Sequence, residues 1–274
     1  MGGIEFLKGH GTQNDFVVLP DVDGRLDLTA RRVAALCDRR RGLGADGVLR
    51  VVRAAAIDVE SDGEWFMDYR NADGSLAEMC GNGARVFARY LVDAGLVAGG
   101  DFTLGTRAGD RPVRTHPDGT VTVHMGRAVI TGSSVTTVSG REFSGVAVDV
   151  GNPHLVSFGD GDVAALDLSE PPLFDTEFFP RGVNLEFVDS VGPETLRMRV
   201  FERGVGETRA CGTGTVAAVA ASLHLAGTDT GESTVDIPGG SVHVTVSPGE
   251  STLTGAAVIV ARGELDGAWW DSVV

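Results

Sequence analysis

The sequence has few of the side chains on which cofactor and metal sites are usually built. Lysine occurs once, at Lys8, among 23 basic residues. A pyridoxal phosphate enzyme needs a lysine for its Schiff base, and no phosphate-binding motif lies near Lys8. The three cysteines, Cys37, Cys80 and Cys211, form no CxxC pair of the kind found in zinc and redox sites, and they are too few for a disulfide framework. We therefore expect no cofactor and no metal ion.

Long apolar runs and an excess of positive charge are absent as well. The best apolar run, residues 215–226, is interrupted by Ser222 and His224 and falls short of the roughly 20 residues that a membrane span needs. The N-terminal segment has no basic head followed by an apolar region, so no secretory signal is expected. The net charge of −15 disfavours binding to nucleic acid and to anionic membranes. We therefore expect a cytoplasmic protein without nucleic-acid or membrane partners.

The residues that are present predict a packed globular protein of two domains. Of the 274 residues, 42% are hydrophobic and 22% are charged, and this length exceeds that of one ordinary domain. Apolar periodicity after the capping residue Thr29 predicts a helix at 29–40 with Cys37 in the core. GLGADG at 42–47 follows this helix rather than a strand, so it is interpreted as a loop and not as a dinucleotide-binding turn. Strands are expected at 46–52 and 64–70, and hairpins at 112–125 and around 248–250.

Two segments indicate an internal duplication. CGNGARVFARYLVDAG at 80–95 and CGTGTVAAVAASLHLAG at 211–227 each follow a predicted strand, open with cysteine and glycine, and end in glycine, the usual helix stop. An offset of 131 residues superposes Cys80 on Cys211 and Met67 on Met198. A weaker match relates residues 14–18 to 152–156. We therefore predict two similar halves, each with one cysteine at a helix start.

The two CGxG turns combine a thiol with unpaired backbone amides. A thiol at a helix start lies at the positive end of the helix dipole, which favours the thiolate. The first turn leaves N–H groups unpaired, and glycine lets a ligand come close to them. Gly81, Asn82, Gly212 and Thr213 could therefore hold a carboxylate between the two helix starts. The alternative is a pair of tight turns with small buried cysteines, and the presence of two similar copies favours the site.

The sequence resembles the diaminopimelate epimerases over essentially its whole length. The matching motifs are GHGTQNDFVV at 9–18, RRGLGADG at 40–47, YRNADGSLAEMCGNGAR at 69–85, VGNPHLV at 150–156, GVNLEFV at 182–188 and FERGVGETRACGTGT at 201–215. CGTG alone is shared with proline racemases, whereas CGNGAR together with ERGxGET is far more specific. The resemblance implies conversion of LL-2,6-diaminopimelate to the meso isomer without a cofactor, in lysine and cell-wall precursor biosynthesis.

The two cysteines suggest a two-base inversion of an α-carbon. The thiolate of one, Cys80 or Cys211, would remove the α-proton from one face, while the thiol of the other delivers a proton to the opposite face. The proton that they share makes their titration a property of the pair. Carbanion charge would spread into the substrate carboxylate, where the helix-start N–H groups can stabilise it as an oxyanion hole does.

The resemblance also implies roles for residues around the cysteines. His154 and Glu202 would tune the pKa values of the thiols. The implied substrate-binding residues are Asn14, Asn71, Gly81, Asn82, Asn152, Asn184, Glu202, Arg203, Gly212 and Thr213. Without the motifs, an asparagine is more typical of a turn, and a histidine or glutamate in a loop is more often simply solvated. Many members of the family carry glutamine where this chain has Gly47, so no side-chain contact is expected from that position.

The implied fold is α/β, of mixed α+β type, with two pseudo-symmetric domains, each a mixed sheet wrapped around a central helix. We expect one domain at 1–117, to which 263–274 returns, and the other at 118–262, with the site in the cleft between them. Two other functions stay open: a proline or hydroxyproline racemase-type enzyme that uses the same thiols, and a non-catalytic metabolite-binding protein or thiol redox sensor. A homodimer is also left open.

Overall fold

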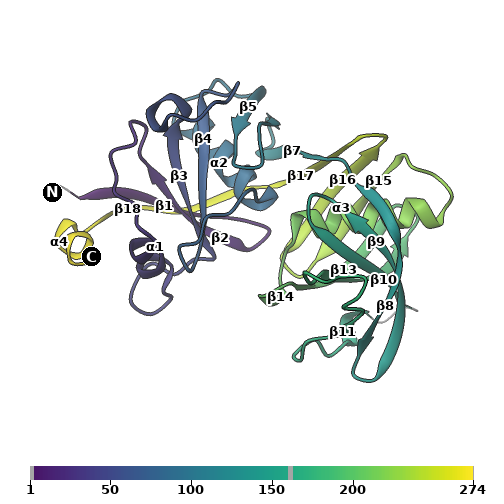
Figure 1. Ribbon diagram of the computed structural model, residues 1–274. Helices are drawn as coiled ribbons and strands as arrows, with labels where there is room; N and C mark the ends of the chain where they lie inside the picture. Colours follow the sequence, from purple (N-terminus) through teal and green to yellow (C-terminus); the bar gives the residue numbers. More distant parts are fainter. Residues whose placement is uncertain (1–2, 160–162, 274) are drawn as a thin grey trace. The chain divides into compact units, whose positions relative to one another are not determined.

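The computed structural model describes residues 3–159 and 163–273, which divide into two compact units (Figure 1). One unit comprises Met1–Val123 and Ala256–Val274, and the other comprises His124–Gly255. These boundaries differ from the expected 1–117 with 263–274, and 118–262. The expected boundary after residue 117 lies in the turn between strands β6 (Arg111–Thr115) and β7 (Thr120–Gly126), and the expected boundary after residue 262 lies within a strand that pairs with the N-terminal strand.

The first unit is a mixed sheet that surrounds helix α2 (Gly81–Asp93). Neighbouring strands are antiparallel except for the parallel pairs β2–β3 and β4–β5. The strands follow one another in the order β18 (Val258–Leu265), β1 (Ile4–Gly11), β2 (Asn14–Pro20), β3 (Gly47–Arg53), β4 (Trp65–Asn71), β5 (Asp101–Gly105), β6 and β7. The remaining elements are α1 (Ala30–Cys37), a short 3-10 helix (Ala54–Ile57) and α4 (Gly267–Ser272).

The second unit repeats this order of strand directions around helix α3 (Gly212–Leu225). Here β10–β12 and β13–β15 are the parallel pairs, and the other neighbours are antiparallel. The strands are β8 (Val129–Val138), β9 (Arg141–Asp149), β10 (Pro153–Phe158), β12 (Asn184–Gly192), β13 (Thr195–Glu202), β15 (Gly231–Ile237), β16 (Gly240–Ser247) and β17 (Glu250–Ala256). The short strands β11 (Leu173–Phe174) and β14 (Gly206–Thr208) pair with β8 and β13, and a 3-10 helix spans Val163–Ala165.

The matching strand order confirms the pseudo-symmetric fold that the sequence predicted. Helix α2 begins 131 residues before α3, as the duplication requires. Strand β18, from the C-terminal end of the chain, takes the place in the first unit that β8 takes in the second. Each central helix contacts most strands of its own sheet, so the sheet curves around it. Helix α3 is accordingly apolar on all sides, with a run of valines and alanines that is buried.

The local predictions for the first unit are confirmed with one change of length. Thr29 caps α1 by accepting a hydrogen bond from the Arg32 backbone N–H at 3.3 Å, and Cys37 packs in the core beside β2 and β3. The helix ends at Cys37 rather than at residue 40. It stops there because the Asp38 carboxylate accepts hydrogen bonds from the backbone N–H groups of Arg40 and Arg41 and so stabilises a turn.

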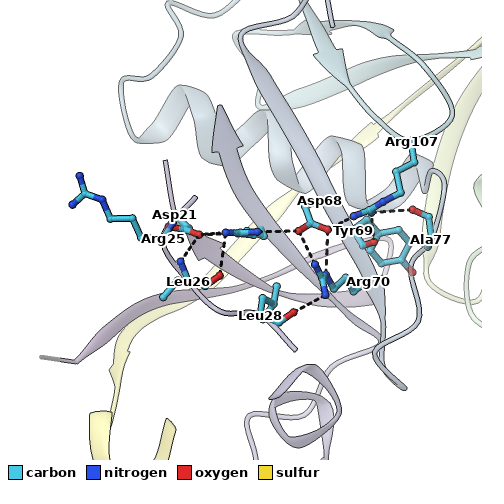
Figure 2. A network of polar contacts seen from close by, with 10 residues as sticks. Asp21, Arg25, Leu26, Leu28, Asp68, Tyr69, Arg70, Ala77 and Arg107 are labelled. Atoms are coloured by element: carbon cyan, nitrogen blue, oxygen red, sulfur yellow. Dashed lines mark hydrogen bonds and ion pairs between the residues drawn. The ribbon is translucent and has the colours of Figure 1, made fainter. Parts of the chain in front are cut away.

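A buried carboxylate on β4 stabilises the segment that leads to Cys80 (Figure 2). The side chain of Asp68 is 3% exposed and contacts the guanidinium groups of Arg50, Arg70 and Arg107. Arg107 also donates to the backbone carbonyl oxygens of Tyr69 and Ala77, at 2.8 and 3.4 Å. Arg107 therefore ties the loop after β4 to the strand itself.

The pKa of Asp68 predicts how this network depends on pH. Burial alone raises that pKa, but the hydrogen bonds and charges of Arg70 and Arg107 outweigh it, and the pKa is lowered. The stabilisation is therefore fully present above the unfolded-state pKa of about 3.9, and it is lost as the pH falls through the lower folded-state value.

We expect Asp68→Asn to reduce the free energy of unfolding by about 3 kcal/mol near pH 7, because it leaves the partly buried guanidinium groups of Arg70 and Arg107 without their anion, while Arg50 keeps Asp21. The difference from the wild type should shrink below about pH 4. Urea unfolding at several pH values measures both effects. The exposed Asp101, paired with Arg114 on neighbouring strands, provides the control substitution to asparagine, for which a much smaller loss is expected. An equal loss in both variants would contradict the importance of the buried network.

Candidate active site

Cys80 begins helix α2 beside two asparagine side chains of the first unit. Its backbone is extended, with φ −143° and ψ 118°, and its sulfur accepts a hydrogen bond from the Gly83 N–H at 3.4 Å. The Cys80 Sγ lies 3.6 Å from Asn14 Oδ1, and the same oxygen accepts a hydrogen bond from Asn82 Nδ2 at 3.2 Å. Asn14, Cys80 and Asn82 are thus brought together from two elements.

A tight turn between β1 and β2 brings Asn14 to the helix start. Thr12 and Gln13 have φ values of 49° and 63°, as a two-residue hairpin turn requires. A Cβ at Gly11 would lie 2.9 Å from the backbone carbonyl oxygen of Asn82, so glycine allows the strand end to approach α2. The turn and the helix start are therefore fitted to each other.

Further polar groups surround this cluster. Asp46, in the loop before β3, accepts from Asn14 Nδ2 at 2.7 Å, and Arg39 contacts both Asp15 and Asp46. The ammonium group of Lys8 contacts Asp15 at 2.5 Å and also donates to the Gly44 carbonyl. Burial raises the pKa of Asp15, but the hydrogen bonds from Arg39 and Lys8 outweigh it and lower that pKa to about 2.

Cys211 begins helix α3 among acidic groups of the second unit. The residue is buried, and its sulfur lies 3.6 Å from the hydroxyl of Thr213. Burial, followed by the negative charges of Glu202 and Glu186, raises the pKa of the Cys211 thiol well above its usual value. Burial also raises the pKa of the Glu202 carboxyl, which accepts a hydrogen bond from the Thr208 hydroxyl and one from Cys211. A proton is therefore retained easily in this cluster.

A buried histidine lies in the same unit on β10. His154 Nδ1 lies 2.7 Å from Glu186 Oε1, and both side chains are 0% exposed. His154 Nε2 lies 2.9 Å from Asn152 Oδ1. Both ring nitrogens thus lie within hydrogen-bonding distance of an oxygen atom, and these two contacts fix the orientation of the ring.

Asn184 and Arg203 are linked through the backbone at the ends of β12 and β13. Asn184 Nδ2 donates to the Pro153 carbonyl at 3.2 Å, and Asn184 Oδ1 accepts from the Arg203 backbone N–H at 3.0 Å. The Arg203 guanidinium donates a hydrogen bond to the Arg181 carbonyl at 3.0 Å, and the residue is exposed to solvent. The guanidinium fork thus lies where a ligand could reach it.

Most of the residues predicted from the sequence gather at one of the two helix starts. In the second unit the side chain of Asn152 forms a hydrogen bond with His154. The other predicted residues of this unit near the start of α3 are His154, Glu202, Cys211, Gly212 and Thr213. Gly81 and Asn82 form the buried first turn of α2. Asn71 instead donates to the Ser75 hydroxyl at 3.0 Å, within its own loop.

Gly47 cannot carry a side chain in this conformation. A Cβ there would lie 2.6 Å from the Arg70 carbonyl oxygen and 2.7 Å from the Tyr69 ring. A glutamine at this position would therefore require β4 to shift.

Sequence reasoning missed Glu186, Thr12, Asp46 and Arg85. Glu186 and Arg85 are charged residues within apolar periodic patterns, at positions where the pattern places side chains in the core, and they are buried. A charged residue in a predicted core position is a signal that could have identified both. Thr12 and Asp46 lie in loops, where their residue types carry no such signal.

The described part of the chain offers thiols, carboxylates and one buried imidazole for acid–base chemistry. Among residues 3–159 and 163–273, no cluster of three or more histidine, cysteine, aspartate or glutamate side chains is placed to hold a metal ion. No helix in those ranges is both long and apolar enough to cross a membrane. Groups of these kinds can take up and release protons.

Comparison with known proteins gives a consistent result. The model of the family described as diaminopimelate epimerase matches residues 6–131 and 146–264. The diaminopimelate epimerase of Rhodococcus jostii (strain RHA1) is 54% identical over 288 aligned positions, which cover 98% of this chain and 100% of the relative. That of Mycolicibacterium smegmatis is 55% identical over 287 positions, with 98% and 99% covered.

Solved structures of more distant proteins share the fold. A PhzF-family phenazine biosynthesis protein of Bacillus anthracis superposes with a TM-score of 0.69 at 18% identity, covering 97% of this chain and 100% of that chain. A hydroxyproline epimerase of Agrobacterium vitis, with bound trans-4-hydroxy-L-proline, gives 0.68 at 16% identity, covering 98% and 96%. At these identities the likeness concerns the fold alone.

The effect of the Glu186 charge on the pKa of the Cys211 thiol should be measurable. We expect Glu186→Gln to lower the pKa of the Cys211 thiol by roughly one unit, because it removes a nearby negative charge that disfavours the thiolate. The measurement is the pH dependence of Cys211 alkylation, followed by peptide mass spectrometry. Glu207→Gln, on β14 and paired with Arg199, is the matched control and should leave that pKa near its wild-type value. A similar shift in both variants would refute a specific effect of Glu186.

Proposed function

The chain belongs to the diaminopimelate epimerase family, and we propose that it interconverts LL- and meso-2,6-diaminopimelate by proton transfer at one α-carbon. The observation that carries this proposal is the presence of one thiol at the equivalent helix start of each duplicated unit, Cys80 on α2 and Cys211 on α3. More than half of the aligned positions are identical to those of proteins named diaminopimelate epimerase, and this identity supports diaminopimelate as the substrate. The reaction belongs to lysine and cell-wall precursor biosynthesis.

In the proposed mechanism the two thiols act on opposite faces of the α-carbon. One sulfur, as thiolate, takes the α-proton, and the other, as thiol, gives a proton to the opposite face, so that configuration is inverted. In the reverse reaction the two sulfurs exchange these roles. Because the amino acid keeps all its atoms except one exchanged hydrogen, the chemistry consumes no cofactor.

The helix starts would stabilise the negative charge that develops on the substrate. The first-turn N–H groups of α2 and α3 have no partners within their helices, which makes them donors for a carboxylate. Gly81 and Asn82 in one unit, and Gly212 and Thr213 in the other, are the residues that would supply these donors. Such donors act most strongly on the carbanion, whose charge spreads into the carboxylate.

His154 and Glu202 are proposed to tune the proton affinity of Cys211. A raised pKa keeps this thiol protonated in the free protein, which suits it to deliver a proton. The Glu202 carboxyl, which also has a raised pKa, lies within hydrogen-bonding reach of the thiol and can exchange a proton with it. Glu186 contributes a negative charge near the Cys211 thiol in this proposal and also orients the His154 ring.

Substrate selection is proposed to rest on the end of diaminopimelate that does not react. Two thiols and backbone amides would accept any α-amino acid, so discrimination requires polar groups for a second carboxylate and amine. The planar guanidinium of Arg203 suits a bidentate contact to that carboxylate. The asparagines at 14, 71, 152 and 184 are the other proposed contacts. Racemisation of proline by the native protein would favour a proline racemase-type function instead.

Isotope incorporation tests the function directly. We expect incubation of the wild-type protein with LL-diaminopimelate in deuterated water to give the meso isomer with one deuterium at the inverted α-carbon. The rate should be unchanged by a chelator and by added pyridoxal phosphate. Chiral chromatography with mass measurement follows both quantities. Absence of exchange would leave a metabolite-binding protein or thiol sensor, and inversion without deuterium would rule out proton exchange with solvent.

Removal of each thiol tests the two-base mechanism. We expect Cys80→Ala and Cys211→Ala each to reduce epimerisation on the order of 10³-fold or more, since each deletes one of two required proton carriers. We expect each variant still to exchange the α-hydrogen of the one stereoisomer that presents this hydrogen to its remaining thiol. Cys37→Ala is the matched control, because Cys37 packs in the core of the first unit and should leave the rate nearly unchanged. Near wild-type interconversion of both isomers by either active-site variant would exclude the mechanism.

A further inference from the structure

A tight turn directly before strand β12 lies against the side chain of Arg203. Residues 179–182 form this turn, which is closed by a hydrogen bond from the Gly182 N–H to the Phe179 carbonyl at 3.0 Å. Proline at the second position and glycine at the fourth are typical of such turns, and the sequence here is Phe-Pro-Arg-Gly. Gly182 has a φ of 78°, a conformation that glycine adopts without strain.

The backbone is fixed on both sides of this contact. Phe179 and Val183, which flank the turn, pack in the core of the second unit. Asn184 Oδ1 accepts a hydrogen bond from the Arg203 backbone N–H at 3.0 Å, while Asn184 Nδ2 donates to the first carbonyl of β10 at 3.2 Å. The backbones of Gly182 and Arg203 are therefore held, and the exposed Arg203 side chain is the part that can move.

The aliphatic part of Arg203 passes through the space that the missing side chain of Gly182 leaves. A Cβ at Gly182 would lie 2.9 Å from Arg203 Cδ and 3.1 Å from Arg203 Cγ. Carbon atoms that are not bonded to each other pack best at about 3.5 Å or more. Because Cγ and Cδ precede the guanidinium in the side chain, any residue larger than glycine would rotate the whole guanidinium away from its present place.

The carbonyl of Arg181 in the same turn holds the far end of the side chain. Arg203 Nη1 donates to this oxygen at 3.0 Å, and within the described residues the guanidinium has no other hydrogen bond or ion pair. Nε and Nη2 form one edge of the guanidinium fork, which matches the two oxygens of a carboxylate. The turn thus orients the fork and leaves this edge for a ligand.

We propose that Gly182 is a positioning residue for substrate binding: the space at Gly182 and the Arg181 carbonyl hold Arg203 in the conformation that receives the carboxylate at the end of diaminopimelate that does not react. This inference rests on the proposed function, which assigns that carboxylate to Arg203. A freely rotating arginine loses conformational entropy when it binds a ligand. A side chain that is already held in place loses less, so the same contact gives tighter binding.

The first test is the kinetics of Gly182→Ala with LL-diaminopimelate. We expect KM to rise about tenfold and kcat to change less than about twofold, because the displaced contact binds an end of the substrate that is the same in the ground and transition states. The pH dependence of Cys80 and Cys211 alkylation should stay as in the wild type. A changed titration of either thiol would show that the substitution disturbs the reacting end, and it would overturn the proposal.

Gly140→Ala is the matched control for backbone strain. Gly140 lies in the turn between β8 and β9 with a φ of 79°, and no atom lies within 4 Å of a Cβ built there. Alanine is therefore strained equally at the two positions, but only at Gly182 does it meet another side chain. We expect Gly140→Ala to leave KM near its wild-type value. An equal rise of KM in both variants would assign the effect to strain and overturn the proposal.

A double-mutant cycle with Arg203→Ala tests whether Gly182 acts through Arg203. Alanine at position 203 has neither Cγ nor Cδ, so a Cβ at position 182 no longer meets them. In the Arg203→Ala background, Gly182→Ala should therefore lower kcat/KM no further than Gly140→Ala does. If the effects of Gly182→Ala and Arg203→Ala instead multiply, Gly182 acts by another route and the proposal is wrong.

A second substitution covers a failure of Gly182→Ala to fold. Asparagine tolerates a positive φ better than alanine but still carries a Cβ, so Gly182→Asn keeps the contact with less strain. Gly140→Asn is then the control, and the same results are expected.

The outcomes separate this inference from the proposed function. Turnover of diaminopimelate by the wild type, together with effects that multiply in the cycle, would overturn the inference alone. Absence of turnover by the wild type would overturn the proposed function, and this inference with it.

Discussion

Each unit depends on a helix that is buried within its own sheet and yet begins with backbone amides that have no partner in the helix. The buried length of α2 and α3 supplies the core of each unit, and the sheet must curve to surround it. The first turn cannot be paired in the same way, because an α-helix leaves its first N–H groups free. An extended cysteine occupies the cap position of each helix, and the Cys80 sulfur accepts a hydrogen bond from the Gly83 N–H.

The duplicated backbone carries different charges at its two helix starts. Around Cys80 the deeply buried charge is the cation Arg85, whose pKa burial lowers to about 10. Around Cys211 the buried charges are the carboxylates of Glu186 and Glu202, and His154 on β10 contacts Glu186. One fold thus gives each thiol its own electrostatic surroundings. The proposed proton transfer in opposite directions would require such separate control.

Close packing of backbone limits the sequence at several positions around these turns. Gly11 lies against the carbonyl of Asn82, and a Cβ at Gly214 would lie 2.7 Å from Glu186 Oε1. The loop before Cys80 is held to β4 by the Asp68 and Arg107 pair. Close backbone contacts at the two glycines and the buried ion pair therefore help to determine where the two helix starts lie.

The sequence by itself determined the helix caps, the hairpins and the duplication, because these depend on residues close in the chain or on a repeated pattern. It also singled out the two cysteines, since a CGxG turn carries its own local chemistry. The tertiary structure alone decided that Glu186 contacts His154, that Asn14 donates to Asp46, and that β18 completes the first sheet. These contacts join residues far apart in the sequence, and local periodicity contains no information about which distant groups meet.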